Sequence, residues 1–311
     1  MPGGYAAWLL PSTTMPRVAI APLIGLAYIL SLAGIGELHG SNIVLGTLGL
    51  LDVYNAKTRQ FLRTFLPCII TGAIYDSFRF TMPPLTRGHV HVAGPYFLDR
   101  ALFGVGGHTL NEVFAAHHWA AADLIAGFAY LGYVAEFMGL TLLLFFRRDV
   151  VRALTFARGF LVVNLLGFVT YIAYPAAPPW YVAEHGFGPA QMRVAASPGA
   201  AVRFDRLLGT HVFRDVYSHC AEVFGALPSL HAAYPALALL LLLRMPTLRW
   251  ARWPACAYAL VIACSAVYLQ HHYVIDVLLG WTYAVITAVI VGAWERVSVA
   301  ATARPPAHHS A

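Results

Sequence analysis

The chain has 311 residues, of which 59% are hydrophobic and only 11% are charged. Soluble domains carry about 25% charged residues, so this composition excludes a soluble globular protein and indicates one embedded in a bilayer. The formal net charge of +6 comes almost entirely from arginine. These charges lie in short loops, not in a patch with stacking aromatics, which argues against a nucleic-acid partner.

Apolar stretches recur along the chain, and several are shorter than the roughly 20 residues that a helix needs to cross a bilayer. They cover residues 18–36, 42–53, 64–80, 120–146, 154–174, 229–243, 253–270 and 273–295. The stretch at 42–53 suits a second short pass, a re-entrant segment or an interfacial helix. We therefore predict an all-α integral membrane protein.

The spacing of these stretches divides the chain into three predicted parts. Residues 1–63 form one or two N-terminal membrane segments, residues 64–296 form the transmembrane core, and residues 297–311 form a tail. We expect this terminal tail to be disordered and cytoplasmic.

Basic residues gather in alternate connections between the apolar stretches. The groups are Lys57, Arg59 and Arg63; Arg147, Arg148, Arg152 and Arg158; Arg244, Arg249 and Arg252; and Arg296. If each apolar stretch from residue 64 onward crosses the membrane once, all four groups lie on the same side. The positive-inside rule assigns that side to the cytoplasm. Residues 81–119, 175–228 and 271–272 then face the exoplasmic side. Abundant alanine, and arginine in place of lysine, favour a bacterial inner membrane with this face in the periplasm.

His272 and Asp276 lie four residues apart at the predicted start of the last helix, so they share a face. A carboxylate there can hold one imidazole nitrogen and stabilise the charged ring, which leaves the other nitrogen free to attack phosphorus. The plainer interpretation is a polar cap at headgroup level. Ionisable residues at membrane depth are costly, which favours a functional role.

His231 lies in the first turn of another predicted helix, after Pro228 and Ser229. Proline suits this position, and Ser229 suits a helix cap or a phosphate ligand. His231 can give a proton to a leaving oxygen or take one from an acceptor. An ordinary Pro-Ser helix start with an incidental histidine is the alternative.

A phosphate group also needs a cation. Arg79, at the exoplasmic end of the stretch 64–80, is the first candidate, although an interfacial anchor that reaches water is an equal alternative. Glu222, just upstream of His231, could supply an acid that supports the site, but we favour its interpretation as a solvated loop carboxylate.

The runs PSLHA at 228–232 and HHYVID at 271–276 resemble the type 2 phosphatidic acid phosphatase (PAP2) superfamily. Within this superfamily, the two runs most closely resemble the inositol phosphorylceramide synthase branch. The run YPAAPPWY at 174–181 also resembles that branch. This implies a six-helix catalytic core plus one or two N-terminal membrane helices. It also implies that His272 forms a phosphohistidine, that Asp276 orients it, and that His231 is the general acid/base. Substrate-binding positions are predicted at Ser229, Arg79, Tyr273 and Trp180.

Two departures from the superfamily pattern concern the charge of the substrate. The phosphatase motif begins Ser-Arg, whereas Ser265 is followed here by Ala266, and no Lys-x6-Arg-Pro motif occurs. Phosphatases use those cations on a phosphomonoester, which is nearly dianionic, whereas a phosphodiester carries one charge. The sequence therefore favours transfer of a phospho-headgroup from a phospholipid. The resemblance implies phosphatidylinositol as donor and ceramide as acceptor, with no metal or organic cofactor.

Three alternatives remain at this point. A lipid phosphate phosphatase would share the phosphohistidine and differ only in using water as the attacking group. A di-iron enzyme would need clustered histidine boxes, and the chain has only isolated pairs. A transporter or lipid-binding membrane protein would fit broken helices, but no inverted repeat is visible. The oligomeric state is not indicated.

Overall fold

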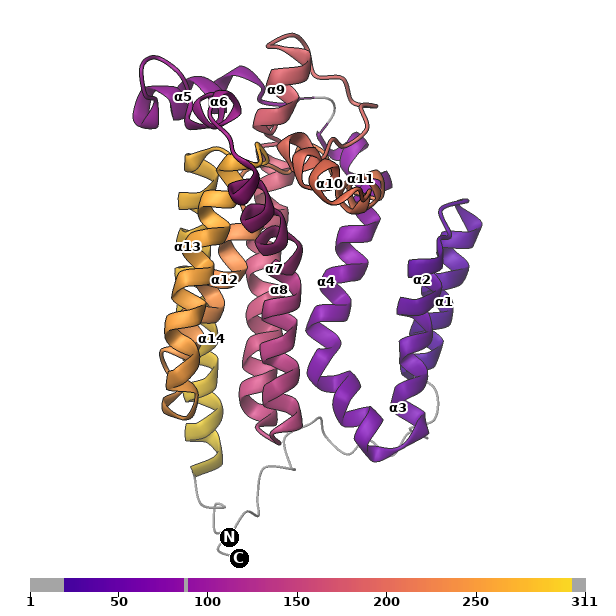
Figure 1. The fold of residues 1–311 in the computed structure, drawn as a ribbon. Helices are drawn as coiled ribbons and strands as arrows, with labels where there is room; N and C mark the ends of the chain where they lie inside the picture. The colour runs from indigo at the N-terminus through magenta and orange to yellow at the C-terminus, as the bar shows by residue number, and fades with distance from the viewer. Residues whose placement is uncertain (1–19, 87–88, 304–311) are drawn as a thin grey trace, which may run out of the picture. The chain divides into compact units, whose positions relative to one another are not determined.

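The computed structural model describes residues 20–86 and 89–303. The chain divides into two compact units, Met1–Leu66 and Pro67–Ala311. Within the described residues the regular structure is helical, and β-pairing is limited to isolated bridges (Figure 1). The prediction of an all-α protein is confirmed.

The first unit contains short helices. They are α1 (Ile20–Gly34), α2 (Gly40–Thr47), the 3-10 helix η1 (Leu48–Leu50) and α3 (Leu51–Tyr54). Glycines allow α2 and η1 to pack closely on α1. A Cβ on Gly25 would collide with the carbonyl of Gly46, and one on Gly49 with the carbonyl of Ala21. The predicted stretch 42–53 is therefore helical and lies along α1.

Helices also account for the remaining apolar stretches. They are α4 (Ala56–Thr86), α7 (Ala120–Phe146), α8 (Val150–Ala173), α12 (Leu230–Leu242), α13 (Arg252–Tyr268) and α14 (Val274–Ala303), with the 3-10 helix η3 (Pro246–Ala251) before α13. Four of the described helical segments are long and apolar enough to cross a membrane: 120–146, 150–173, 246–268 and 274–296. The protein is thus an integral membrane protein. The predicted tail is helical as far as Ala303, and its remainder lies outside the described residues.

The short helix α12 lies at the centre of the second unit, packed against α7, α8, α13 and α14. Its side chains Leu237, Ala238 and Leu242 have no exposed surface. Because neighbouring helices surround α12, this helix is shielded from lipid along much of its length. Its first turn therefore starts inside the protein.

The segments predicted as exoplasmic loops contain further short helices. They are α5 (Ala93–Phe103), α6 (Leu110–Ala116), α9 (Pro179–His185), η2 (Gly199–Ala201), α10 (Val202–Leu208) and α11 (Val212–Ser218). They cover the end of the second unit opposite the α7–α8 connection (Figure 1). The starts of α12 and α14 lie beneath this cover.

The first turns of α12 and α14 are joined directly. The backbone N–H of Ser229 donates to the carbonyl of Asp276 across 2.9 Å. A Cβ on Gly280 would collide with the carbonyl of Ser229, so the glycine permits this close approach. The two sequence runs that carry the predicted chemistry therefore meet in space.

Candidate active site

His231 and His272 are in direct contact. The Nδ1 atom of His231 lies 3.0 Å from the Nε2 atom of His272. The Nδ1 atom of His272 lies 2.8 Å from the carbonyl oxygen of Ala226. A carbonyl can only accept, so Nδ1 of His272 carries the proton and Nε2 carries the lone pair. His231 then donates its Nδ1–H to that lone pair, which is the one available to attack phosphorus.

Asp276 lies beside the same ring without hydrogen-bonding to it. Its Oδ2 atom is 3.7 Å from Nδ1 of His272 and accepts a hydrogen bond from the backbone N–H of Tyr273 at 2.7 Å. The residue has no exposed surface. The carboxylate can therefore stabilise a positive charge on the ring, while the carbonyl of Ala226 sets the tautomer.

The carbonyl of Ala226 is positioned by the Pro-rich segment 174–181. Within this segment, Ala176 donates to the carbonyl of Phe224 at 2.8 Å, and Ala177 donates to the carbonyl of His91 at 3.0 Å. Ala226 donates in turn to the carbonyl of Ala176 at 3.4 Å. The segment thus connects the chain before α5 to the residue that fixes the tautomer of His272. Side-chain motifs did not reveal this role, because a backbone carbonyl has no sequence signature.

Two buried polar side chains from the cover hold the turn before α14. Asn111 of α6 donates to the carbonyls of Val267 and His272, at 2.8 and 3.0 Å. Asp99 of α5 accepts from the backbone N–H of Ile275 at 3.0 Å. Burial raises the pKa of Asp99 to about 6. The sequence interpretation missed both residues, since neither lies in a recognisable motif.

A column of stacked rings lies against the reacting pair. Tyr217 and His271 have ring centroids 4.6 Å apart, His271 and Tyr130 5.1 Å, and Tyr130 and His231 4.3 Å, with interplanar angles of 8°, 17° and 15°. Tyr133 lies one turn further along α7, and its ring centroid is 4.2 Å from that of His231. The imidazole of His231 is therefore held by aromatic faces as well as by its hydrogen bond.

A cavity of about 460 Å³ opens beside the pair. Its walls come from α4, α7, α8 and α12 and from the cover, and they are mostly apolar and aromatic. His231, His271, His272 and Trp180 all line it. None of the described residues that line this cavity is an arginine or a lysine. Such walls suit acyl chains and a headgroup of low charge.

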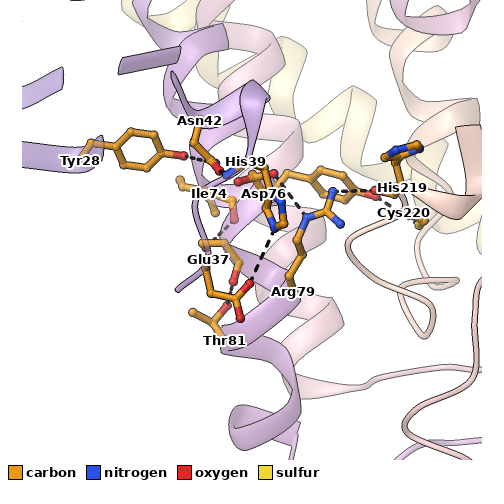
Figure 2. A network of polar contacts seen from close by, with 12 residues as sticks. Tyr28, Glu37, His39, Asn42, Ile74, Asp76, Arg79, Thr81, His219 and Cys220 are labelled. Carbon is orange, nitrogen blue, oxygen red and sulfur yellow. Dashed lines mark hydrogen bonds and ion pairs between the residues drawn. The ribbon is translucent and has the colours of Figure 1, made fainter. Parts of the chain in front are cut away.

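The other predicted binding residues lie elsewhere. Ser229 is buried and caps α12 by accepting from the backbone N–H of Ala232. Tyr273 is also buried and does not line the cavity. Arg79 donates to the carbonyl of His219 at 2.7 Å and lies 3.5 Å from Asp76 (Figure 2). It lines a separate, smaller cavity of about 110 Å³.

The interpretation of Glu222 as a solvated loop carboxylate is wrong. The residue lines both the large and the small cavity, and its Oε1 atom accepts from the backbone N–H of Phe224 at 2.6 Å. Burial raises the pKa of this carboxyl to about 7. The arrangement thus combines a histidine pair, a buried carboxylate beside it, and a carboxyl on the cavity wall.

Comparison with known proteins identifies related sequences. A family model for the PAP2 superfamily matches residues 96–290. The phosphoinositol dihydroceramide synthase of Bacteroides thetaiotaomicron is 37% identical over 86% of this chain and 89% of its own length. Two fungal proteins are also similar. The inositol phosphorylceramide synthase catalytic subunit of Schizosaccharomyces pombe is 31% identical over 74% of this chain, and the inositol phosphorylceramide synthase of Candida albicans 34% over 72%. The chain spans 53% and 46% of those fungal proteins. No solved structure matches the chain.

Proposed function

The chain belongs to the PAP2 superfamily and is a membrane phosphotransferase, and we propose that it moves phosphoinositol from phosphatidylinositol to a hydroxyl of ceramide. The names of the similar bacterial and fungal proteins support this choice of lipids. The observation that carries the proposal is the lone pair of His272 Nε2, held against His231 at the wall of a mostly apolar cavity.

The proposed first half-reaction forms a phosphohistidine. Nε2 of His272 attacks the phosphorus of the donor, the new P–N bond forms, and the bond from phosphorus to the glycerol oxygen breaks. His231, as an imidazolium beside the anionic phosphodiester, gives its proton to that oxygen and releases diacylglycerol. The phosphorylated ring of His272 still carries its Nδ1 proton and a positive charge, which the carboxylate of Asp276 stabilises.

The second half-reaction returns the enzyme to its starting state. Neutral His231 takes the proton of the acceptor hydroxyl, whose oxygen attacks phosphorus as the P–N bond breaks. The product is a new phosphodiester, and His272 regains its lone pair. Water in place of the lipid hydroxyl would give hydrolysis. A wall without arginine or lysine among its described residues supports a singly charged phosphodiester over a phosphomonoester.

We further propose that the site faces the periplasm of a bacterial inner membrane. The starts of α12 and α14 lie at the end of the second unit that carries the cover, whereas the α7–α8 connection lies at the other end (Figure 1). That connection contains Arg147 and Arg148, which the positive-inside rule assigns to the cytoplasm. Every residue placed in the site lies between 64 and 296, which supports these limits for the catalytic core.

The test uses purified protein and phosphatidylinositol labelled with ³²P. Labelled inositol phosphorylceramide that appears only when ceramide is added supports transfer. Labelled inositol phosphate formed without ceramide would identify a hydrolase instead. In the absence of acceptor, label should be trapped on the protein in an alkali-stable, acid-labile bond, and His272→Ala should abolish it. Transfer at an unchanged rate by His272→Ala would contradict the phosphohistidine.

A further inference from the structure

The mechanism leaves several polar groups of the cavity wall without a role, among them Glu222 and His271. Both line the cavity that His231 and His272 line. Glu222 lies four residues before Ala226, whose carbonyl holds His272. His271 immediately precedes the nucleophile in the chain. Both groups therefore share the cavity with the proposed nucleophile, so a donor lipid whose phosphorus reaches His272 would share it with them.

The tautomer of His271 makes it a hydrogen-bond acceptor. Its ring lies between Tyr217 and Tyr130 and is hydrogen-bonded to the carbonyl of Pro198. Its Nε2 atom is buried and has no partner among the described residues. The nitrogen bonded to Pro198 is therefore Nδ1, which carries the proton, and Nε2 carries a lone pair. Burial lowers the pKa of His271 to about 3, so the ring stays neutral.

Glu222 is an acceptor too, and its position is fixed. One carboxyl oxygen receives the backbone N–H of Phe224 at 2.6 Å. The methylene of Glu222 packs over Gly225, where a Cβ would come within 3.1 Å of Cγ. In its ionised form, this carboxyl repels a phosphodiester in the same cavity. A hydroxyl on the ligand that donates a hydrogen bond to Glu222 reduces this repulsion.

We propose that Glu222 and His271 form a subsite that accepts hydrogen bonds from the hydroxyl groups of a polyol headgroup on the donor lipid. This inference rests on the proposed function, since it assumes that the donor headgroup occupies this part of the cavity. The subsite selects the donor because a headgroup without hydroxyls leaves the buried acceptor of His271 unpaired. A headgroup that carries an ammonium would pair with Glu222 alone.

The test measures donor binding without turnover. His272→Ala protein in nanodiscs is titrated with phosphatidylinositol, with phosphatidylinositols that each lack one ring hydroxyl, and with phosphatidylethanolamine. The same titrations are repeated with His272→Ala protein that also carries Glu222→Ala or His271→Asn. Asparagine is chosen at position 271 because it keeps an N–H toward Pro198 and removes the Nε2 acceptor. Glu184→Gln is the matched control, since Glu184 is a carboxylate on α9 that does not line the cavity.

We expect each variant to weaken phosphatidylinositol binding about 10-fold, the effect of losing a hydrogen bond to a buried acceptor. The His272→Ala protein should bind phosphatidylinositol more tightly than each deoxy analogue. Each added substitution should abolish this difference for one particular analogue. A general structural defect would not produce such a coupling between one residue and one hydroxyl. Equal weakening for every lipid, tighter binding of phosphatidylethanolamine than of phosphatidylinositol, or no binding of phosphatidylinositol would overturn the inference. Failure of wild-type protein to transfer to ceramide would refute the proposed function alone, because these titrations need no acceptor.

Discussion

The Nδ1–H of His231 points at the lone pair of His272 Nε2 across 3.0 Å, so the proposed acid/base and the proposed nucleophile are hydrogen-bonded to each other. A phosphorus atom that reaches Nε2 must replace this contact. The contact keeps the lone pair aimed at His231 until the donor arrives. It also brings the proton donor close to the bond that must break, because both groups then lie against the same phosphate.

Replacement of His231 by asparagine tests its role as the acid. Asparagine keeps an N–H near the position of Nδ1 but cannot transfer a proton, so transfer should fall about 10²- to 10⁴-fold. The loss should shrink with a donor whose leaving group is p-nitrophenol, which needs no protonation. Initial rates with both donors measure this. The same loss with each donor would contradict the assignment of His231 as general acid.

Replacement of Asp276 by asparagine separates charge from geometry. The amide oxygen can still accept from the N–H of Tyr273, and the Ala226 carbonyl still holds Nδ1 of His272, so the tautomer should persist. We expect kcat to fall about 10²-fold, since the positive charge on the phosphorylated ring loses its counter-ion. Phosphohistidine formation in a single turnover measures this. An unchanged rate would show that the charge of Asp276 has no part in the reaction.

Glu222 should make stability depend on pH. Its pKa is raised by burial from 4.5 to about 7, so the folded state prefers the protonated carboxyl. Stability from this group is therefore full below about pH 4.5 and is lost as the pH rises to about 7, with no further change above that. Thermal unfolding between pH 4.5 and 8.5 should show this decline, and Glu222→Gln should reduce it, leaving the part that the raised pKa of Asp99 contributes up to about pH 6. Glu184→Gln should keep the whole decline, and a decline as large in Glu222→Gln as in the wild type would assign it to other groups.

Gly280 should tolerate no side chain. A Cβ there would collide with the carbonyl of Ser229 and push the start of α12 away from α14. Gly280→Ala should cost about 1–3 kcal/mol of stability, the usual effect of overpacking, and should lower kcat by displacing His231 from His272. Gly139→Ala is the control, because nothing lies within 4 Å of a Cβ at Gly139. Equal unfolding temperatures and rates for both variants would contradict the close approach.

The membrane helices were predictable because their cause is local. The stretch 120–146 has the same limits as α7, and 253–270 and 273–295 fall close to α13 and α14. Apolar length alone decides these elements, since a bilayer requires every backbone polar group in the span to be paired within the helix. The short helices α5, α6 and α9 to α11 were missed, because helices of 7 to 11 residues leave too little periodicity to detect.

The sequence by itself identified the candidate reacting groups, His231, His272 and Asp276, and predicted the face on which they are expected to lie. It did so because side-chain chemistry and helix starts are written in short runs of residues. Tertiary structure alone decided which carbonyl fixes the tautomer of His272, that Asn111 and Asp99 hold the turn, and that Glu222 lies on the cavity wall while Arg79 does not line it. The physical reason is that these contacts join segments far apart in the chain, often through backbone atoms, and only packing brings them together.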